Sequence, residues 1–322
     1  MTIHEFYHRG IPANIKQILW NLFWQIKFII RFLPQHIEAS INYLLHNRDA
    51  FEHQLIIITK VKNEADNLKE WIEYNKLTGV EKFIIYDNES NDHTKEVLQP
   101  YIDSGEVDYI FYPGILKRPV QAKIVDEAVR RYRNKTKWIA VVDVDEFIIP
   151  VQTGNILNTI ADIEKDLGKK INALAINWVM YGYNGHRVKP GGLVIENYTK
   201  HDGINPHIKS IVNPRFVIRY HIHNAIYLFA IPARNEKGIA VREGVVQNLS
   251  DISIEKIRIN HYYTKSYEEH IQKIGRYHAM LNIQEEEIPV FDPEFMSHHE
   301  DRIMDKYIPL LHMDSVLTDI VN

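Results

Sequence analysis

The sequence contains no cysteine, and its positive and negative charges nearly balance. Without cysteine, its 322 residues cannot form a disulfide, a thiolate zinc site or a cysteine nucleophile. The formal net charge is −4 at pH 7, so no basic field is available to recruit nucleic acid. We therefore expect no nucleic-acid partner, and the missing thiols fit a reducing compartment.

Long uninterrupted hydrophobic runs are also missing. The most apolar window, residues 15–33, contains too many polar residues for a membrane-spanning helix: Lys16, Asn21, Gln25, Lys27 and Arg31. Residues 1–12 lack the compact apolar segment of a signal peptide and carry His4, Glu5, His8 and Arg9. We expect a cytoplasmic protein, with a peripheral position on the inner face of the membrane as an alternative.

The same window has the spacing of an amphipathic helix, because its apolar residues recur at intervals of three and four. No acid occurs between Gly10 and Gln35, while Lys27 and Arg31 supply positive charge. Such a helix can lie in an anionic membrane interface. It can equally pack on the protein or at a subunit contact. The sequence leaves both readings open and indicates no oligomeric state.

Strand and helix patterns alternate regularly after this window. Apolar, β-branched segments at 55–61, 83–86, 107–112 and 138–142 predict strands, and helical periodicity falls between them at 64–78, 92–104 and 119–132. Helical connections of this length imply right-handed crossovers, so we predict an α/β fold with a mainly parallel mixed sheet flanked by helices. We assign residues 1–53 to an N-terminal helical segment, 54–265 to the main domain, and 266–322 to a C-terminal helical segment with a last helix over 296–311.

Two aspartates stand at the end of the fourth predicted strand, where Val142 precedes Asp143, Val144 and Asp145. Carboxylates at the end of a buried strand need a cation or hydrogen-bond donors to offset the cost of removing their charge from water. If the backbone stays extended, both carboxylates project from one side. Such hard oxygen ligands suit Mg²⁺ or Mn²⁺ carrying phosphates. Alternatively, the acids merely close a strand and start a turn.

Polar residues also follow the other predicted strands, at 60–64, 87–89 and 114–118. The carboxyl ends of parallel strands meet at one edge of a sheet, and ligands bind there. The sequence lacks both G-x-G-x-x-G and G-x-x-x-x-G-K-[ST], so neither the dinucleotide fingerprint nor the P-loop is present. A phosphate-bearing ligand would have to be held by a metal ion and side chains.

Several ordered segments carry a family resemblance: Lys62-Asn63-Glu64, Asp87-Asn88-Glu89-Ser90, Asp143-Val-Asp145-Glu146-Phe147, Asn177-Trp178, Gly185-His186 and Asn260-His261-Tyr262-Tyr263-Thr264-Lys265. Together they resemble glycosyltransferases with the nucleotide-sugar-binding, Rossmann-like GT-A fold, and the match is closest to the family 2-like and family 92 groups. The resemblance spans residues 55–277. It is specific for the family but not for a substrate.

The resemblance implies a metal site. Asp143 and Asp145 would hold Mn²⁺ or Mg²⁺ against the diphosphate of the donor, with Asp143 also near the ribose. His261 is implied as a third ligand, since a neutral imidazole is an acceptable partner for manganese; otherwise it is a polar residue at a strand end. Asp87 is implied to read uracil by accepting a hydrogen bond from a ring N–H. The implied donor is therefore a UDP-sugar.

Further residues are implied at the donor. Asn63 and Glu64 occupy positions that line the nucleotide pocket, although they could equally cap the first helix. Lys117 and Gln121 are implied near the ribose or phosphate, or else begin a solvated helix. Lys265 would face phosphate, or is a surface lysine.

Transfer also needs a base on the acceptor side of the sugar. Besides the metal ligand Asp145, we predict Asp202 as catalytic, because a flexible loop at 201–203 can present a base to an acceptor. Glu196 and Glu243 are alternatives, and surface charge explains any of the three. We predict that Trp178 and His186 contact the acceptor, with ordinary packing as the alternative.

These features predict a metal-dependent glycosyltransferase that moves a hexose, with galactose as one candidate, from a UDP-sugar to a glycan or lipid-linked saccharide. The resemblance implies inversion at the anomeric carbon, and we expect a place in surface polysaccharide biosynthesis. Two alternatives stay open. One is a nucleotidyl or phosphoryl transferase using the same acidic site, and the other is a glycan-binding scaffold without turnover.

Overall fold

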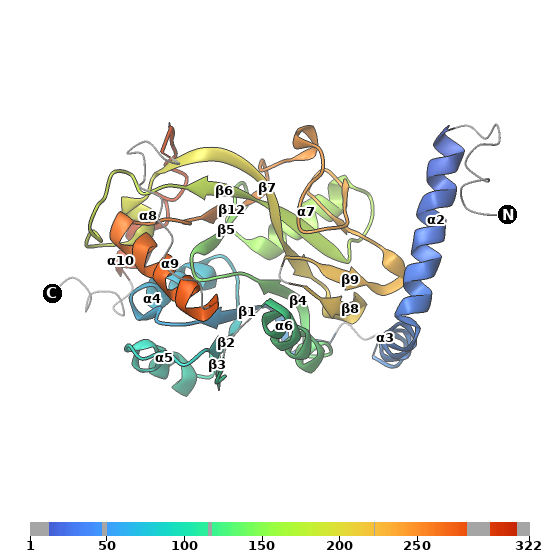
Figure 1. Ribbon diagram of the computed structural model, residues 1–322, viewed down its shortest axis with the longest axis horizontal. Helices are drawn as coiled ribbons and strands as arrows, with labels where there is room; N and C mark the ends of the chain where they lie inside the picture. Colours follow the sequence, from blue (N-terminus) through green and yellow to red (C-terminus); the bar gives the residue numbers. More distant parts are fainter. Residues whose placement is uncertain (1–12, 47–49, 115–117, 222, 282–296, 314–322) are drawn as a thin grey trace.

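The computed structural model describes residues 13–46, 50–114, 118–221, 223–281 and 297–313, and strands alternate with helices in the predicted order (Figure 1). Its α-helices are α2 (Ala13–Arg31), α3 (Leu33–Leu45), α4 (Ala65–Leu77), α5 (Thr94–Asp103), α6 (Arg118–Tyr132), α7 (Ile156–Asp166), α8 (Val194–Asn197), α9 (Tyr267–Leu281) and α10 (Ile308–Met313). Its strands are β1 (His53–Val61), β2 (Lys82–Asp87), β3 (Val107–Phe111), β4 (Thr136–Val141), β5 (Glu146–Pro150), β6 (Ala173–Tyr181), β7 (Lys200–Val212), β8 (Val217–Tyr220), β9 (Ala225–Tyr227), β10 (Ala233–Arg234), β11 (Ala240–Val241), β12 (Ile257–His261) and β13 (His299–Glu300). Short 3-10 turns are η1 (Pro214–Phe216), η2 (Leu228–Ala230) and η3 (Leu249–Asp251).

One mixed sheet of 11 strands organises the described residues. Its order is β11-β10-β6-β7-β4-β1-β2-β3, with β12 joined to β5 and β6 and β13 joined to β7. The strands from β4 to β3 are parallel. Beyond them, β7 runs antiparallel to both β4 and β6. The α/β fold predicted from the sequence, a mixed sheet flanked by helices, is confirmed.

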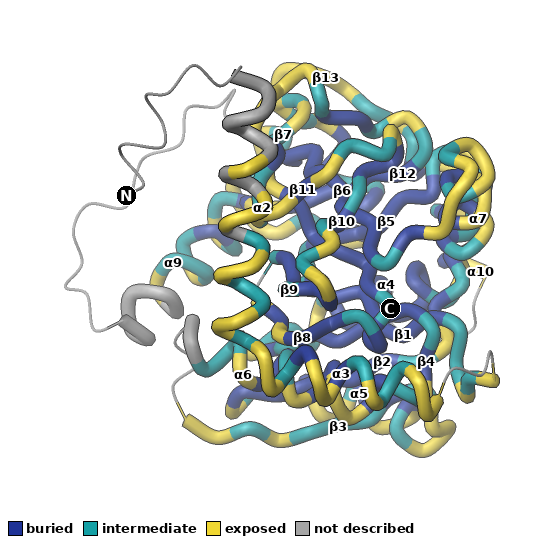
Figure 2. The backbone as a smooth tube through the Cα atoms, turned by 90° about the vertical axis from the view of Figure 1, so that its right-hand side faces the viewer, coloured by how far each residue is buried: buried dark blue, intermediate teal, exposed yellow. Residues whose placement is uncertain are grey.

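The first strand is buried on both faces, as a central parallel strand requires. Leu55 and Ile57 pack into the cluster that contains Trp71 of α4, whereas Ile56 and Ile58 pack into the cluster that contains residues of α6. Figure 2 shows the sheet as a buried centre with exposed elements around it. This two-sided burial explains why the strand reads as a continuous apolar run in the sequence.

The C-terminal segment differs from the prediction. A continuous helix over 296–311 is wrong, because His299 and Glu300 pair with β7 as β13 and α10 begins only at Ile308. Pairing with β7 gives this backbone an alternative to helical hydrogen bonds. Met304 and Leu311 are buried in the main core, so the segment helps to complete that core.

The N-terminal helical pattern is present as α2 and α3. Within the described ranges, no helix has both the length and the apolarity needed to cross a membrane.

One buried carboxylate fixes the start of β12. Glu236 accepts hydrogen bonds from the backbone N–H groups of Glu255 at 2.8 Å, Lys256 at 2.9 Å and Ile257 at 2.9 Å. We predict that Glu236→Ala lowers the free energy of unfolding by about 3 kcal/mol, because it leaves one buried and two part-buried backbone donors without their acceptor. Urea unfolding measures the loss, and Glu236→Gln, which keeps one acceptor oxygen, should lose less. Equal stability of the three proteins would contradict this account.

Candidate active site

The two aspartates lie in a turn between β4 and β5. The N–H of Glu146 donates to the carbonyl of Asp143 at 3.0 Å, and the Glu146 carboxylate accepts from the N–H of Asp143 at 3.0 Å. These hydrogen bonds turn the chain between Asp143 and Asp145. The condition for both carboxylates to project from one side, an extended backbone past Val142, is therefore not met, because the chain turns here.

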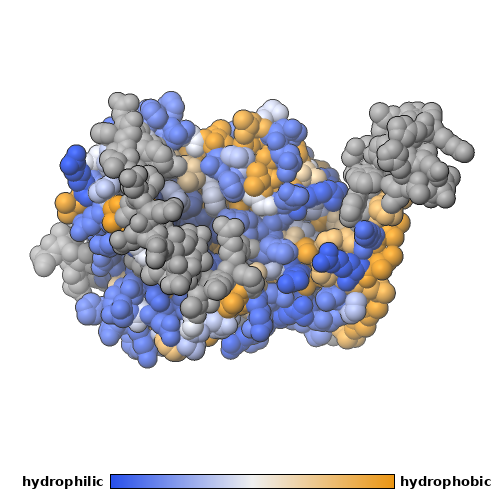
Figure 3. Space-filling model, viewed as in Figure 1, coloured by the Kyte–Doolittle hydropathy of each residue, from blue (hydrophilic) through white to orange (hydrophobic). Residues whose placement is uncertain are grey.

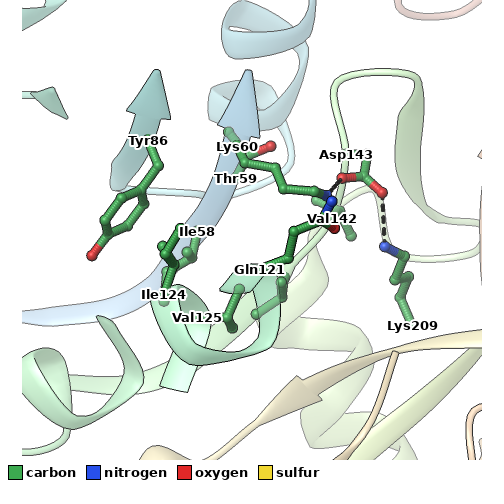
Figure 4. A pocket seen from close by; sticks show the side chains of 11 residues that line it. Ile58, Thr59, Lys60, Tyr86, Gln121, Ile124, Val125, Val142, Asp143 and Lys209 are labelled. Carbon is green, nitrogen blue, oxygen red and sulfur yellow. Dashed lines mark hydrogen bonds and ion pairs between the residues drawn. The ribbon is translucent and has the colours of Figure 1, made fainter. Parts of the chain in front are cut away.

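Asp143 is held by lysines from the two strands that flank β4 (Figure 4). Nζ of Lys60, on β1, lies 2.5 Å from Oδ1, and Nζ of Lys209, on β7, lies 2.9 Å from Oδ2. Desolvation raises the pKa of Asp143, but the ammonium groups of Lys209 and Lys60 outweigh it and hold the pKa well below its usual value. Asp143 is therefore ionised at neutral pH.

Asp145 faces a different pair of side chains. Its Oδ2 lies 2.6 Å from Nζ of Lys273, on α9, and 3.5 Å from Nε2 of His261, at the end of β12. The antiparallel register of β5 and β12 pairs His261 with Glu146 and so brings the imidazole to the turn. Desolvation raises the pKa of Asp145, but Lys273 and then His261 lower it well below its usual value.

Glu146 is a third carboxylate in the cluster and is almost fully buried. Burial raises its pKa, although Nζ of Lys209 lies 3.4 Å away and opposes the shift. Its Oε1 and Nδ1 of His261 lie 3.9 Å apart, and within the described residues neither atom has a hydrogen-bond partner. The cluster thus has unused donor and acceptor capacity on the side of His261.

Two of the three predicted metal ligands lie together. Two ligand atoms that each lie about 2.1 Å from Mg²⁺ or Mn²⁺ are about 3 Å apart when their bonds to the metal form a right angle. The distance between Oδ2 of Asp145 and Nε2 of His261 is 3.5 Å. Asp143 does not join them, because its oxygens contact Lys60 and Lys209. Over the ranges that the structure describes, no group of three histidine, aspartate or glutamate side chains could hold a metal ion. Asp145 and His261 are therefore the two predicted ligands that lie near each other, and Oδ2 of Asp145 also contacts Nζ of Lys273, as the oxygens of Asp143 contact Lys60 and Lys209.

A cavity of about 400 Å³ opens beside Asp145 and collects residues that the sequence assigned to the donor. Asn63, Glu64 and Lys265 line it, together with Lys273. Asn63 and Lys265 have φ angles of 55° and 51°, the left-handed conformation that costs non-glycine residues energy and clusters at binding sites. Glu64 precedes α4, but its side chain makes no capping hydrogen bond. The cavity therefore unites carboxylate, ammonium and amide groups at the carboxyl end of β1.

Asp87 and Gln121, which were also predicted at the donor, do not line the cavity beside Asp145. Asp87, buried at the end of β2, accepts hydrogen bonds from the hydroxyl of Tyr109 at 2.7 Å and the N–H of Ser90 at 2.9 Å. Desolvation and the Asp87 carboxylate raise the pKa of Tyr109 to about 12, so the hydroxyl stays protonated. Gln121 lines a small cavity together with Asp143 (Figure 4). Lys117 lies outside the described residues.

Trp178 is the centre of a cluster of histidines. The ring of His207 stacks on it at 5.3 Å, and the rings of His223 and His261 meet it edge-on at 5.4 Å and 4.6 Å. The indole Nε1 is buried and has no partner among the described residues. Burial, and then the charge of Lys209, lower the pKa of His223 to about 4, so this imidazole is neutral at physiological pH. One side of the cluster therefore continues directly into the acidic site through His261.

His186 lies in the loop after β6 and lines neither cavity. Its Nε2 lies 3.2 Å from the carbonyl of Asn197, and its own carbonyl accepts from the N–H of Tyr267 at 3.0 Å. The residue ties this loop to the start of α9.

Asp202 lies within β7, so the prediction that it lies in a loop is wrong. Its neighbour His201 pairs with Tyr181 of β6 and with His299 of β13, and the strand continues through Gly203. Its Oδ1 lies 2.5 Å from Nδ1 of His298, and half of its side chain is exposed. It lines neither of the two cavities beside the acidic turn.

Sequence reasoning assigned no role to Lys60, Lys209 and Lys273, which contact the aspartates. Lys209 did offer a signal, because a lysine inside an apolar strand pattern is rarely buried without a partner. Lys273 offered none, since a lysine on an amphipathic helix is ordinarily solvated.

We predict that Lys209→Met destabilises the protein by about 3 kcal/mol near pH 7.5, because it leaves two buried or half-buried carboxylates with less compensation. In the wild type the pKa of Asp143 is lowered, so its contribution is present above the unfolded pKa and is lost on acidification. Burial already raises the pKa of Glu146 against the opposing charge of Lys209, so we expect the loss of Lys209 to raise that pKa further and the Glu146 carboxylate to take up a proton as the pH falls. The stability difference should therefore shrink towards about pH 5 in urea unfolding experiments. A difference that does not change with pH would contradict the assignment.

Comparison with known proteins identifies the class to which this site belongs. A family model described as glycosyltransferase family 92 matches residues 58–284. The chain therefore belongs to glycosyltransferase family 92, as the sequence motifs predicted.

Individual relatives match shorter portions. A family 92 protein of Ricinus communis is 29% identical over 163 residues, covering 50% of this chain and 29% of the relative. A family 92 protein of Oryza sativa subsp. japonica is 31% identical over 165 residues, covering 50% and 27%. The beta-1,4-galactosyltransferase galt-1 of Caenorhabditis elegans is 24% identical over 220 residues, covering 62% and 50%. The chain thus spans half or less of the length of these relatives.

Solved structures show weaker similarity. Residues 1–349 of S. aureus TarS in complex with UDP share 13% identity, with a TM-score of 0.33 and coverage of 51% of this chain and 47% of that chain. A Mycobacterium tuberculosis glucosyl-3-phosphoglycerate synthase in complex with Mn²⁺, UDP-glucose and phosphoglyceric acid shares 13% identity, with a TM-score of 0.26 and coverage of 39% and 44%. Similarity at this level is too low to transfer the role of any residue.

Proposed function

We propose that the chain is a metal-dependent glycosyltransferase that uses a UDP-sugar as donor. The observation that carries the proposal is the placement of Asp145, His261 and the lysines of the adjoining cavity at the carboxyl end of the parallel strands. Family membership supports glycosyl transfer. The name of the Caenorhabditis elegans relative makes galactose the first sugar to test.

The metal ligands in this proposal are Asp145 and His261, with Asp143 close by. Bound Mn²⁺ or Mg²⁺ would act as a Lewis acid on the departing diphosphate. Asp145 suits the role because its lowered pKa keeps it ionised at neutral pH. His261 suits it because its Nε2 faces the same carboxylate.

The chain also supplies positive charge of its own to a leaving diphosphate. Lys265 and Lys273 line the cavity beside Asp145. Nζ of Lys273 is fixed by Asp145 and by the carbonyl of Tyr263 at 3.0 Å. Ammonium groups fixed in advance stabilise developing charge without reorganisation. We infer that Lys265 faces the diphosphate while Lys273 balances the charge of Asp145.

The acceptor in this proposal is a glycan or a lipid-linked saccharide, as in surface polysaccharide synthesis. Trp178 is the sugar contact predicted from the sequence, but in the structure its ring is buried in the main core and His207 stacks on it, which is the packing that the sequence left as the alternative. Transfer with inversion requires a carboxylate that takes the proton of the acceptor hydroxyl. Asp202 is the base predicted from the sequence, and Glu268, which lines the cavity, is its structural competitor.

We predict that Asp145→Asn lowers manganese-dependent conversion of UDP-galactose and water to UDP and free galactose at least about 100-fold, because an electrostatic contribution to the transition state is lost. The matched control is Asp103→Asn, which changes an exposed carboxylate on α5 that accepts a hydrogen bond from Gln99. Release of UDP is measured over a panel of UDP-sugars with and without manganese.

Other outcomes of the same assay decide between functions. Unchanged hydrolysis by Asp145→Asn would overturn the proposal. Release of pyrophosphate from UTP would assign a nucleotidyl transferase, and binding of UDP-sugar without any turnover would assign a scaffold.

The base is tested by comparing Asp202→Asn with Glu268→Gln. If Asp202 is the base, its variant should lose transfer to acceptor about 100-fold while keeping its affinity for UDP, and Glu268→Gln should transfer normally. Isothermal titration with UDP and a transfer assay separate the two quantities. The reverse pattern would assign Glu268 instead.

A further inference from the structure

The outer faces of α2 and α3 expose a row of large apolar side chains. Members of this row follow helical spacing across both helices: Leu19, Leu22, Phe23, Ile26, Ile30, Leu33, Ile37, Ile41, Leu44 and Leu45. Ile30 is 65% exposed and Leu44 is 76% exposed. Isolated exposed apolar residues are ordinary, but a continuous row marks an interaction site.

The row is not the face by which the helices pack on the domain. Ala39 of α3 is buried against Ile218 and Leu228, with Phe32 at the edge of the same cluster. His36, on the same side as Ala39, is also buried. The inner contacts therefore fix the rotation of α3 and leave the apolar row directed outward.

Both helices lie on one side of the molecule. Figure 2 looks onto this side and shows α2 and α3 meeting as an L in front of the sheet. Figure 3 shows hydrophobic residues gathered along the same edge. Because the two helices run in different directions, the exposed row extends over an area of the surface and not along a single line.

The turn η2 adds a second apolar projection beside the helices. Phe229 and Ala230 have φ angles of 57° and 54°, so two successive non-glycine residues adopt the left-handed conformation. Such residues are strained and persist where the surroundings hold them. Phe229 remains 57% exposed and Ile231 39% exposed. Both side chains stay partly exposed beside α2, where Ile231 also lines a cavity with Gln25 and Phe28.

His36 holds this projection next to α3. The N–H of Phe229 donates to Nδ1 of His36 at 3.4 Å, and the two rings stack with centroids 6.4 Å apart. Burial lowers the pKa of His36, which keeps Nδ1 available as an acceptor. This contact attaches the turn to the side of α3 that carries His36. We call the apolar row together with the exposed residues Phe229 and Ile231 the helix–turn face.

Helix α2 carries cations and no acid, while Arg242 and Glu243 lie beside it and line a cavity with Gln25 and Phe28. The sequence has no acid between Gly10 and Gln35, whereas Lys27 and Arg31 are exposed on α2. Glu38 of α3 is paired with Arg130 and Arg133 at 3.5 Å each. Apolar side chains bordered by cations are the pattern of a helix that lies in an anionic lipid interface.

We propose that the helix–turn face docks the protein on an anionic lipid bilayer. The α2 and α3 rows would lie in the plane of the headgroups, and Phe229 and Ile231 would enter beside them. This site is separate from the acidic turn, so the proposal stands independently of the proposed function.

The test is co-sedimentation of the full chain with vesicles of phosphatidylcholine containing phosphatidylglycerol. Ile30→Glu/Ile37→Glu should lower vesicle affinity at least about tenfold, and Phe229→Ser several-fold, because each removes an exposed apolar side chain that the bilayer would bury. Leu310→Glu, an exposed apolar residue on α10, is the matched control and should bind like the wild type. Vesicles of phosphatidylcholine alone should bind all forms more weakly.

Circular dichroism and donor hydrolysis in solution show that the variants fold and keep their chemistry, which separates this test from that of the proposed function. Wild-type protein that does not sediment with vesicles, or variants that sediment equally well, would overturn the proposal. A concentration-dependent dimer in light scattering, abolished by Ile30→Glu/Ile37→Glu, would assign the face to a second copy of the chain instead.

Discussion

Charge compensation around one turn is the constraint on which the rest of the site depends. Asp143, Asp145 and Glu146 are crowded within one tight turn, and carboxylates so close repel one another unless cations accompany them. The chain supplies Lys60 from β1, Lys209 from β7 and Lys273 from α9. The carboxylates of this turn are therefore contacted from the parallel part of the sheet, from its antiparallel part and from helix α9.

This convergence explains why residues far apart in sequence make up the site. β12 pairs antiparallel with β5 and parallel with β6, so it carries His261 to the turn and to Trp178 at once. Glu236 holds the beginning of that strand through three backbone hydrogen bonds. The position of a metal-ligand candidate thus depends on a carboxylate that never contacts it.

The sequence predicted the parallel strands, the helices between them and the family, because burial on two faces and crossover length leave strong periodic patterns. The backbone conformation of individual turns and strand ends was harder to predict from the sequence. The acidic turn was read as extended because nothing in its residue types reveals that Glu146 bonds back to Asp143. The strand around Asp202 was read as a loop because pairing with β13 is a tertiary contact. Lys273 reaches Asp145 only once α9 is packed, and no local pattern encodes that.

The angle between α2 and α3 has a geometrical consequence. A single helix resting on a plane defines only a line, and a body attached to it can roll about that line. Two helices joined as an L define the plane itself, and α3 is fastened to the domain through Ala39 and His36. Any flat partner that engages both arms would therefore hold the whole molecule at one fixed tilt, with the mouth of the cavity beside Asp145 at a constant height above it.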